Sequence, residues 1–190
     1  GPQNRDEELF GHQPFRVLSD YLTKNGIIVL RIDDRGVGAS EGDFATSTIE
    51  NFSKDAISAL SFLREQSSVD LQKVGIIGHS EGGLIATLLA GQYLPGLDFI
   101  VSLAGPAYSI DQLMVDQLYS VGKAAGMLES DLIKARAINQ RNFSIVKSNL
   151  STNEAYAQLV QSMKVSGVAP NNKQMERELF SMLTPAYRYF

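Results

Sequence analysis

The stretch that decides the fold is Lys73-Val74-Gly75-Ile76-Ile77-Gly78-His79-Ser80-Glu81-Gly82-Gly83. An apolar run over residues 73–78 leads directly into the first glycine of a Gly-x-Ser-x-Gly pattern. A helical pattern over residues 81–94 begins just after the serine and ends at a Pro-Gly pair. A buried strand that passes into a helix through a tight turn fits this order. The sequence therefore predicts that the Ser80 hydroxyl projects from a bend between a strand and a helix.

A second Gly-x-Ser-x-Gly pattern occurs at residues 38–42, centred on Ser40. The pattern alone is weak evidence, so the flanking segments must decide between the two. Ser40 lies several residues beyond the nearest apolar run and is followed by a loop-like segment, Asp43-Phe44-Ala45-Thr46. Only the Ser80 pattern has a strand before it and a helix after it.

The rest of the first half alternates helical and strand patterns. Residues 13–25 and 47–64 have helical periodicity, the latter opening with a capping box at Ser47-Thr48-Ile49-Glu50. Residues 27–32 and 99–104 are apolar runs typical of buried strands. Right-handed crossovers would make the three strands parallel neighbours in one sheet. Residues 1–106 are thus predicted to be an α/β domain, a parallel sheet with flanking helices.

The second half shows no further strand pattern. Residues 110–127, 131–148, 153–164 and 173–183 all have the character of helices. Residues 107–190 are therefore predicted to be a separate helical insertion.

Composition excludes several classes of function. The chain has 190 residues, with 17 Lys and Arg against 21 Asp and Glu, a net charge of −4 that argues against nucleic acid as the main partner. There is no Cys and there are two His, which excludes thiolate chemistry and disfavours a multi-His metal site. No apolar run reaches the about 18 residues of a membrane span. No metal or organic cofactor is expected, and neither the oligomeric state nor the compartment can be deduced.

The predicted bend suits nucleophilic catalysis by Ser80. Positions 78 and 82 are expected to need glycine, because a side chain at either would clash where the strand and the helix pack closely. Gly83 gives further room for close helix packing. The Glu81 amide would lie at the helix N-terminus, where it can donate to a developing oxyanion. Asp33, Asp34 and Arg35 are expected to form buried charge-assisted hydrogen bonds that hold their loop near this bend.

Three stretches resemble one known family. Residues 76–83 look like the nucleophile elbow of the α/β-hydrolase superfamily. Residues 33–40 are similar to the loop that follows the preceding central strand in these enzymes, and residues 1–7 resemble the tail of their oxyanion loop. Together with residues 11–15, the resemblance is closest to bacterial esterases and serine hydrolases of the peptidase-like or dienelactone-hydrolase-like group. It implies an incomplete α/β-hydrolase core over residues 1–106 and a helical lid over residues 107–190.

The resemblance also implies roles for the first residues. Gly1 or Gln3 would supply a second oxyanion amide, whereas Pro2 has no N–H. In the superfamily an acid and then a His follow the nucleophile. No His follows Ser80, and His12 and His79 both precede it. We therefore expect a central fragment whose acid and His come from sequence outside these residues.

The leading hypothesis is a serine hydrolase that cleaves small-molecule carboxylic esters through an acyl-enzyme on Ser80. A serine aminopeptidase or acyl-peptide hydrolase is an alternative within the same chemistry. A non-catalytic α/β-hydrolase-like binding module is an alternative of another class, because a serine without a base is a poor nucleophile.

Overall fold

The computed structural model describes residues 2–165 and 173–188. The chain divides into two compact units, Gly1–Gly105 and Pro106–Phe190. Each unit is considered by itself below.

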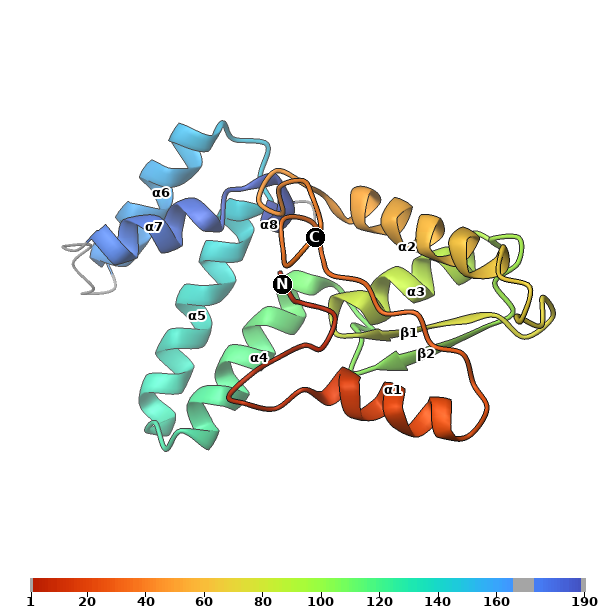
Figure 1. Cartoon of the computed structure of the whole chain (residues 1–190). Helices are drawn as coiled ribbons and strands as arrows, with labels where there is room; N and C mark the ends of the chain where they lie inside the picture. The colour runs from red at the N-terminus through yellow and green to blue at the C-terminus, as the bar shows by residue number, and fades with distance from the viewer. Residues whose placement is uncertain (1, 166–172, 189–190) are drawn as a thin grey trace. The chain divides into compact units, whose positions relative to one another are not determined.

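The centre of the first unit is a parallel β–α–β arrangement. Strand β1 (Gly75–His79) pairs with β2 (Phe99–Leu103) in a register that runs from Gly75 opposite Phe99 to His79 opposite Leu103. Helix α3 (Glu81–Gly91) connects the strands and packs on both, burying Ile85, Ala86 and Leu89. Figure 1 shows α3 and α2 (Ile49–Arg64) on one side of the strands and α1 (Pro14–Lys24) on the other.

Residues 27–32 were predicted to form one of three strands, and this prediction is wrong. This segment has no ladder partner, and β1 and β2 pair only with each other among the described residues. Ile27, Ile28 and Ile32 keep 45–49% of their surface exposed. A β-branched run favours extended backbone, but a strand also needs a second backbone within hydrogen-bonding distance. The sequence shows the first property and is silent on the second.

The start of α2 also differs from the prediction by one residue. The N-cap is Thr48, not Ser47, and its backbone N–H donates to the Asn51 Oδ1 at 2.9 Å. Asn51, and not the predicted Glu50, is therefore the side chain that accepts from the N-cap backbone in the capping box. Ser47 is engaged elsewhere, because its hydroxyl donates to the Asp43 carbonyl at 2.7 Å.

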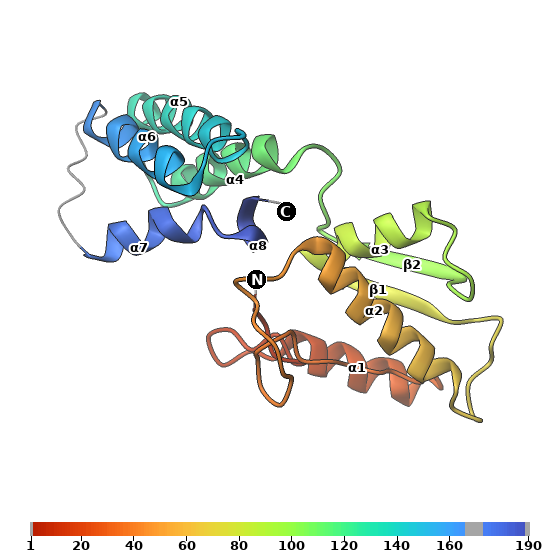
Figure 2. The same cartoon turned by 90° about the horizontal axis from the view of Figure 1, so that it is seen from above.

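The second unit is helical throughout its described part. Its helices are α4 (Ile110–Ala124), α5 (Glu129–Val146), α6 (Thr152–Val165), α7 (Lys173–Ser181) and the short α8 (Pro185–Arg188). Helix α5 packs against both α4 and α6 (Figure 2). The core is formed by apolar residues of α5, α6 and the α7 region: Ile145, Val146, Ala155, Leu159, Leu179 and Leu183. No helix in the described residues is long and apolar enough to cross a lipid bilayer.

One arginine closes this unit near its end. The Arg188 guanidinium donates to the carbonyls of Val146 at 3.1 Å, Ser148 at 2.5 Å and Leu150 at 3.0 Å. These carbonyls lie at the end of α5 and in the loop that follows, where helical partners are missing. Arg188 thus joins α8 to the α5–α6 connection.

Candidate active site

Ser80 occupies the turn between β1 and α3. Its backbone has φ of +52° and ψ of −116°, which an L-residue rarely adopts. The turn is held from both sides: the Ser80 N–H donates to the Leu103 carbonyl at 2.9 Å, and the Ser80 carbonyl accepts from Gly83 N–H at 3.0 Å. Ser80 is exposed, and it lies on a bend that is held on both sides.

The glycines around this turn have different roles. A Cβ on Gly78 would meet the backbone of Gly82, and a Cβ on Gly83 would lie 2.7 Å from the Ser102 hydroxyl and 2.8 Å from the Gly105 Cα. A Cβ on Gly82 would meet nothing within 4 Å. The expectation of a steric need for glycine at position 82 is therefore wrong. The close approach of strand and helix depends on Gly78 and Gly83.

The Glu81 backbone begins helix α3. Amides in the first turn of a helix have no carbonyl partner within that helix and lie at its positive end. The Glu81 side chain is half-buried, and burial raises the pKa of its carboxyl, with the charge of Asp34 adding to the effect. Burial likewise raises the pKa of Asp34. The two carboxyls thus both have raised pKa values, and the charge of Asp34 contributes to the shift at Glu81.

Gln3, one of the two predicted donors of a second oxyanion amide, is engaged with Asp34. The Gln3 N–H donates to the Asp34 Oδ2 at 2.9 Å, and the Asp34 N–H donates back to the Gln3 carbonyl at 3.1 Å. The Gln3 amide is therefore already satisfied in this conformation. Gly1 lies outside the described residues.

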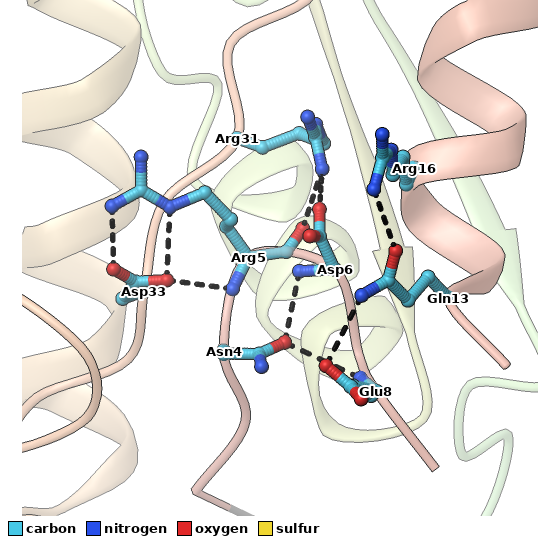
Figure 3. A network of polar contacts seen from close by, with 8 residues as sticks. All are labelled: Asn4, Arg5, Asp6, Glu8, Gln13, Arg16, Arg31 and Asp33. Carbon is cyan, nitrogen blue, oxygen red and sulfur yellow. Dashed lines mark hydrogen bonds and ion pairs between the residues drawn. The ribbon is translucent and has the colours of Figure 1, made fainter. Parts of the chain in front are cut away.

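Asp33 anchors the segment before α1. Its carboxylate accepts from the Arg5 backbone N–H at 2.8 Å, from Nε at 3.0 Å and from Nη2 at 2.6 Å (Figure 3). The hydrogen bonds and charge of Arg5 hold the pKa of this carboxyl well below its usual range. A Cβ on Gly38 would lie 2.6 Å from the Asp33 Oδ2, so the loop wraps closely around the carboxylate.

The other Gly-x-Ser-x-Gly pattern, centred on Ser40, belongs to the loop around Asp33. The Ser40 hydroxyl donates to the Asp33 carbonyl at 2.8 Å, and Ser40 lies in a loop, not between a strand and a helix. Its arrangement is structural, in line with the distinction drawn from sequence.

Sequence reasoning missed one contact at the turn. The His79 Nδ1 lies 2.6 Å from the Glu7 Oε1, and the ring of Phe15 meets the imidazole edge to face with centroids 6.2 Å apart. Glu7 and His79 are 72 residues apart, and no spacing rule connects a loop glutamate with a strand end across that distance. His12 lies in a tight turn where its backbone pairs with Leu9.

In the described part of the chain, neither histidine side chain is hydrogen-bonded to Ser80. Within residues 2–165 and 173–188, no hydrogen bond links His12 or His79 to the Ser80 hydroxyl. The same residues contain no group of three or more His, Asp or Glu arranged to hold a metal ion.

A parallel β–α–β unit with a Gly-x-Ser-x-Gly sequence at its strand–helix junction defines a chain of the α/β-hydrolase class. Residues 13–165 match the sequence model of the family described as serine aminopeptidase, S33, and the chain belongs to this family of serine hydrolases. It is also 31% identical over 134 residues to the esterase EstD of Thermotoga maritima. That alignment covers 68% of this chain and 31% of the relative, so the chain spans about a third of the relative's length.

Proposed function

We propose that this protein is a serine hydrolase that cleaves carboxylic esters through an acyl-enzyme on Ser80. The observation that carries the proposal is that Ser80 is exposed and occupies a strained turn at the N-terminus of α3. Family membership supports a hydrolase, and the name of the Thermotoga relative supports esters as the substrate class.

The proposed reaction begins at the Ser80 hydroxyl. The Ser80 Oγ attacks the ester carbonyl while its proton passes to an imidazole. The negative oxygen that forms is stabilised by the Glu81 N–H at the positive end of α3. The carbon–oxygen bond then breaks, the imidazolium protonates the departing alcohol, and water hydrolyses the acyl-enzyme by the reverse sequence of proton transfers.

The imidazole and its acid partner are assigned to sequence outside these 190 residues. His12 and His79 are held by contacts of their own, and neither bonds to the Ser80 hydroxyl. The second oxyanion amide is assigned to the segment before α1, and Gln3 could supply it only after release from Asp34.

We assign residues 107–190 to a helical lid over the site. This assignment is supported by the division of the chain, in which Pro106–Phe190 form a compact unit of their own that begins shortly after β2 ends at Leu103. Such a unit would set the size of the acyl or alcohol group admitted.

Hydrolysis at a free amino terminus is a second candidate. The matching family is described as a serine aminopeptidase, and the Asp34 and Glu81 carboxyls lie half buried beside the turn. Carboxylates in such a position would attract the ammonium group of a peptide.

Labelling with a fluorophosphonate probe, which attaches to an activated serine Oγ, tests the proposal on the full-length protein. We expect Ser80→Ala to abolish labelling and Ser40→Ala, in the other Gly-x-Ser-x-Gly pattern, to retain it. Labelling that survives Ser80→Ala would overturn the assignment of the nucleophile, and a full-length protein that is never labelled would favour a binding module. Comparing p-nitrophenyl esters with aminoacyl p-nitroanilides then separates the two substrate classes.

A further inference from the structure

We infer that Glu7 and His79 form a positioning pair that keeps the Ser80 turn in its reactive geometry. The inference rests on the proposed function of Ser80. It assigns a role to two residues whose contact has no part in the chemistry described above.

The contact itself is short and directional. The His79 Nδ1 lies 2.6 Å from the Glu7 Oε1, and the side chains are 39% and 18% exposed, respectively. A carboxylate can only accept a hydrogen bond, so the proton between these atoms belongs to Nδ1. Glu7 therefore selects the protonation of one ring nitrogen and, with it, the orientation of the ring.

A second element holds the same ring. Phe15, in the first turn of α1, meets the imidazole edge to face at an interplanar angle of 88°. The imidazole is thus held by the segment before α1 and by α1 itself. Both contacts come from residues far from His79 in sequence.

The segment that carries Glu7 is itself firmly attached. Arg5 binds Asp33, and Asp6 pairs with Arg31, as Figure 3 shows. The Gln3 N–H donates to the Asp34 carboxylate, and the Asp34 N–H donates back to the Gln3 carbonyl. Glu7 extends this network from residues 31–34 to the last residue of β1. Its own backbone, with φ of +51°, turns through a hydrogen bond from its N–H to the Asn4 carbonyl at 2.9 Å.

The consequence concerns the neighbouring serine. His79 directly precedes Ser80, whose φ of +52° persists only if the surrounding structure holds both sides of the turn. Leu103 holds the turn through the Ser80 N–H, and Glu7 holds the side chain before it. Without Glu7 the Ser80 hydroxyl would sample positions away from the line of attack, and small misplacements are known to cost up to about 100-fold in rate.

The pair acts through position and not as a base. The Glu7–His79 contact has the form of the acid–imidazole half of a catalytic triad. Within the part of the chain that the structure describes, however, no hydrogen bond continues from His79 to the Ser80 hydroxyl.

The test uses the full-length protein with Glu7→Ala, Glu7→Gln and the control Glu8→Ala, which changes the next, exposed carboxylate. We expect Glu7→Ala to slow fluorophosphonate labelling and to lower kcat for a p-nitrophenyl ester about 10-fold or more, with KM nearly unchanged. Glu7→Gln, which keeps an accepting oxygen, should recover most of the rate. Glu8→Ala should behave as the unchanged protein.

The imidazole ¹⁵N shifts, assigned through their loss in His79→Asn, give a readout independent of activity. We expect a protonated Nδ1 with Glu7 present and a shift toward Nε2 protonation in Glu7→Ala. An unchanged labelling rate in Glu7→Ala, or an unchanged ¹⁵N pattern, would overturn the positioning pair alone. Failure of the unchanged protein to be labelled at Ser80 would instead overturn the proposed function.

Discussion

A Cβ atom on Gly78 would lie 2.0 Å from the carbonyl oxygen of Gly82. The end of β1 and the first turn of α3 therefore meet backbone against backbone. No side chain fits between them, and the sharpness of the Ser80 turn depends on this contact.

Gly78→Ala should accordingly destabilise the first unit by about 3 kcal/mol or more, because the clash is with backbone that cannot rotate away. The matched variant Gly82→Ala should change stability by no more than about 1 kcal/mol, since its Cβ position is open. Urea unfolding combined with hydrogen exchange of peptides from residues 74–90 measures both. Equal losses in the two variants would contradict the contact.

The Asp33 carboxylate should make the first unit sensitive to acid. Hydrogen bonds from Arg5 lower the pKa of Asp33 in the folded chain. The stabilisation is therefore complete above the unfolded value of about 4 and is lost as the pH falls below it. Asp33→Asn should be less stable at pH 7 and should lose less further stability between about pH 4 and pH 2.

Urea midpoints at pH 7, 4 and 3 measure this difference. Asp20→Asn is the control, because Asp20 is exposed and pairs only with Lys24 one helical turn away. An Asp33→Asn curve parallel to that of the unchanged chain would contradict the assignment.

Arg188 should contribute strongly to the stability of the second unit, because its guanidinium donates to three carbonyls. A lysine in its place could reach at most one or two of the three carbonyls. Arg188→Lys should therefore cost about 2 kcal/mol, whereas Arg141→Lys on an exposed position of α5 should cost little. Faster hydrogen exchange over residues 145–152 in Arg188→Lys alone would support this, and equal exchange in both variants would refute it.

Residues 27–32 should promote self-association of the 190-residue chain. They combine exposed β-branched side chains with backbone that has no ladder partner, a combination that recruits other strands. Ile28→Lys should reduce light scattering at raised protein concentration. Ile133→Lys, on an exposed helical site in the second unit, should reduce it much less.

Local features were predictable because their causes are local. The position of the Ser80 turn follows from an apolar run that ends at a glycine and a helical pattern that begins at Glu81. For Asp33, the sequence predicted charge-assisted hydrogen bonds, but the partner Arg5 lies 28 residues away and was not predicted.

The remaining features depend on distant partners. The pairing of residues 27–32 is decided by which backbone lies beside them, and that is not encoded within the segment. The contact between Glu7 and His79 joins two ordinary residues whose proximity exists only after folding. Even the one-residue shift of the α2 cap reflects a competing bond from Ser47 to Asp43, a choice that capping preferences alone do not resolve.

The left-handed backbone of Ser80 has a consequence for the evolution of this sequence. Glycine adopts positive φ without steric cost, so Ser80→Gly would relieve the strain at the turn. Mutation under selection for thermal robustness alone would then drift toward glycine at position 80. A strained serine at this position is what selection for chemistry would retain. A related sequence with glycine here would mark an inert protein that descends from an enzyme.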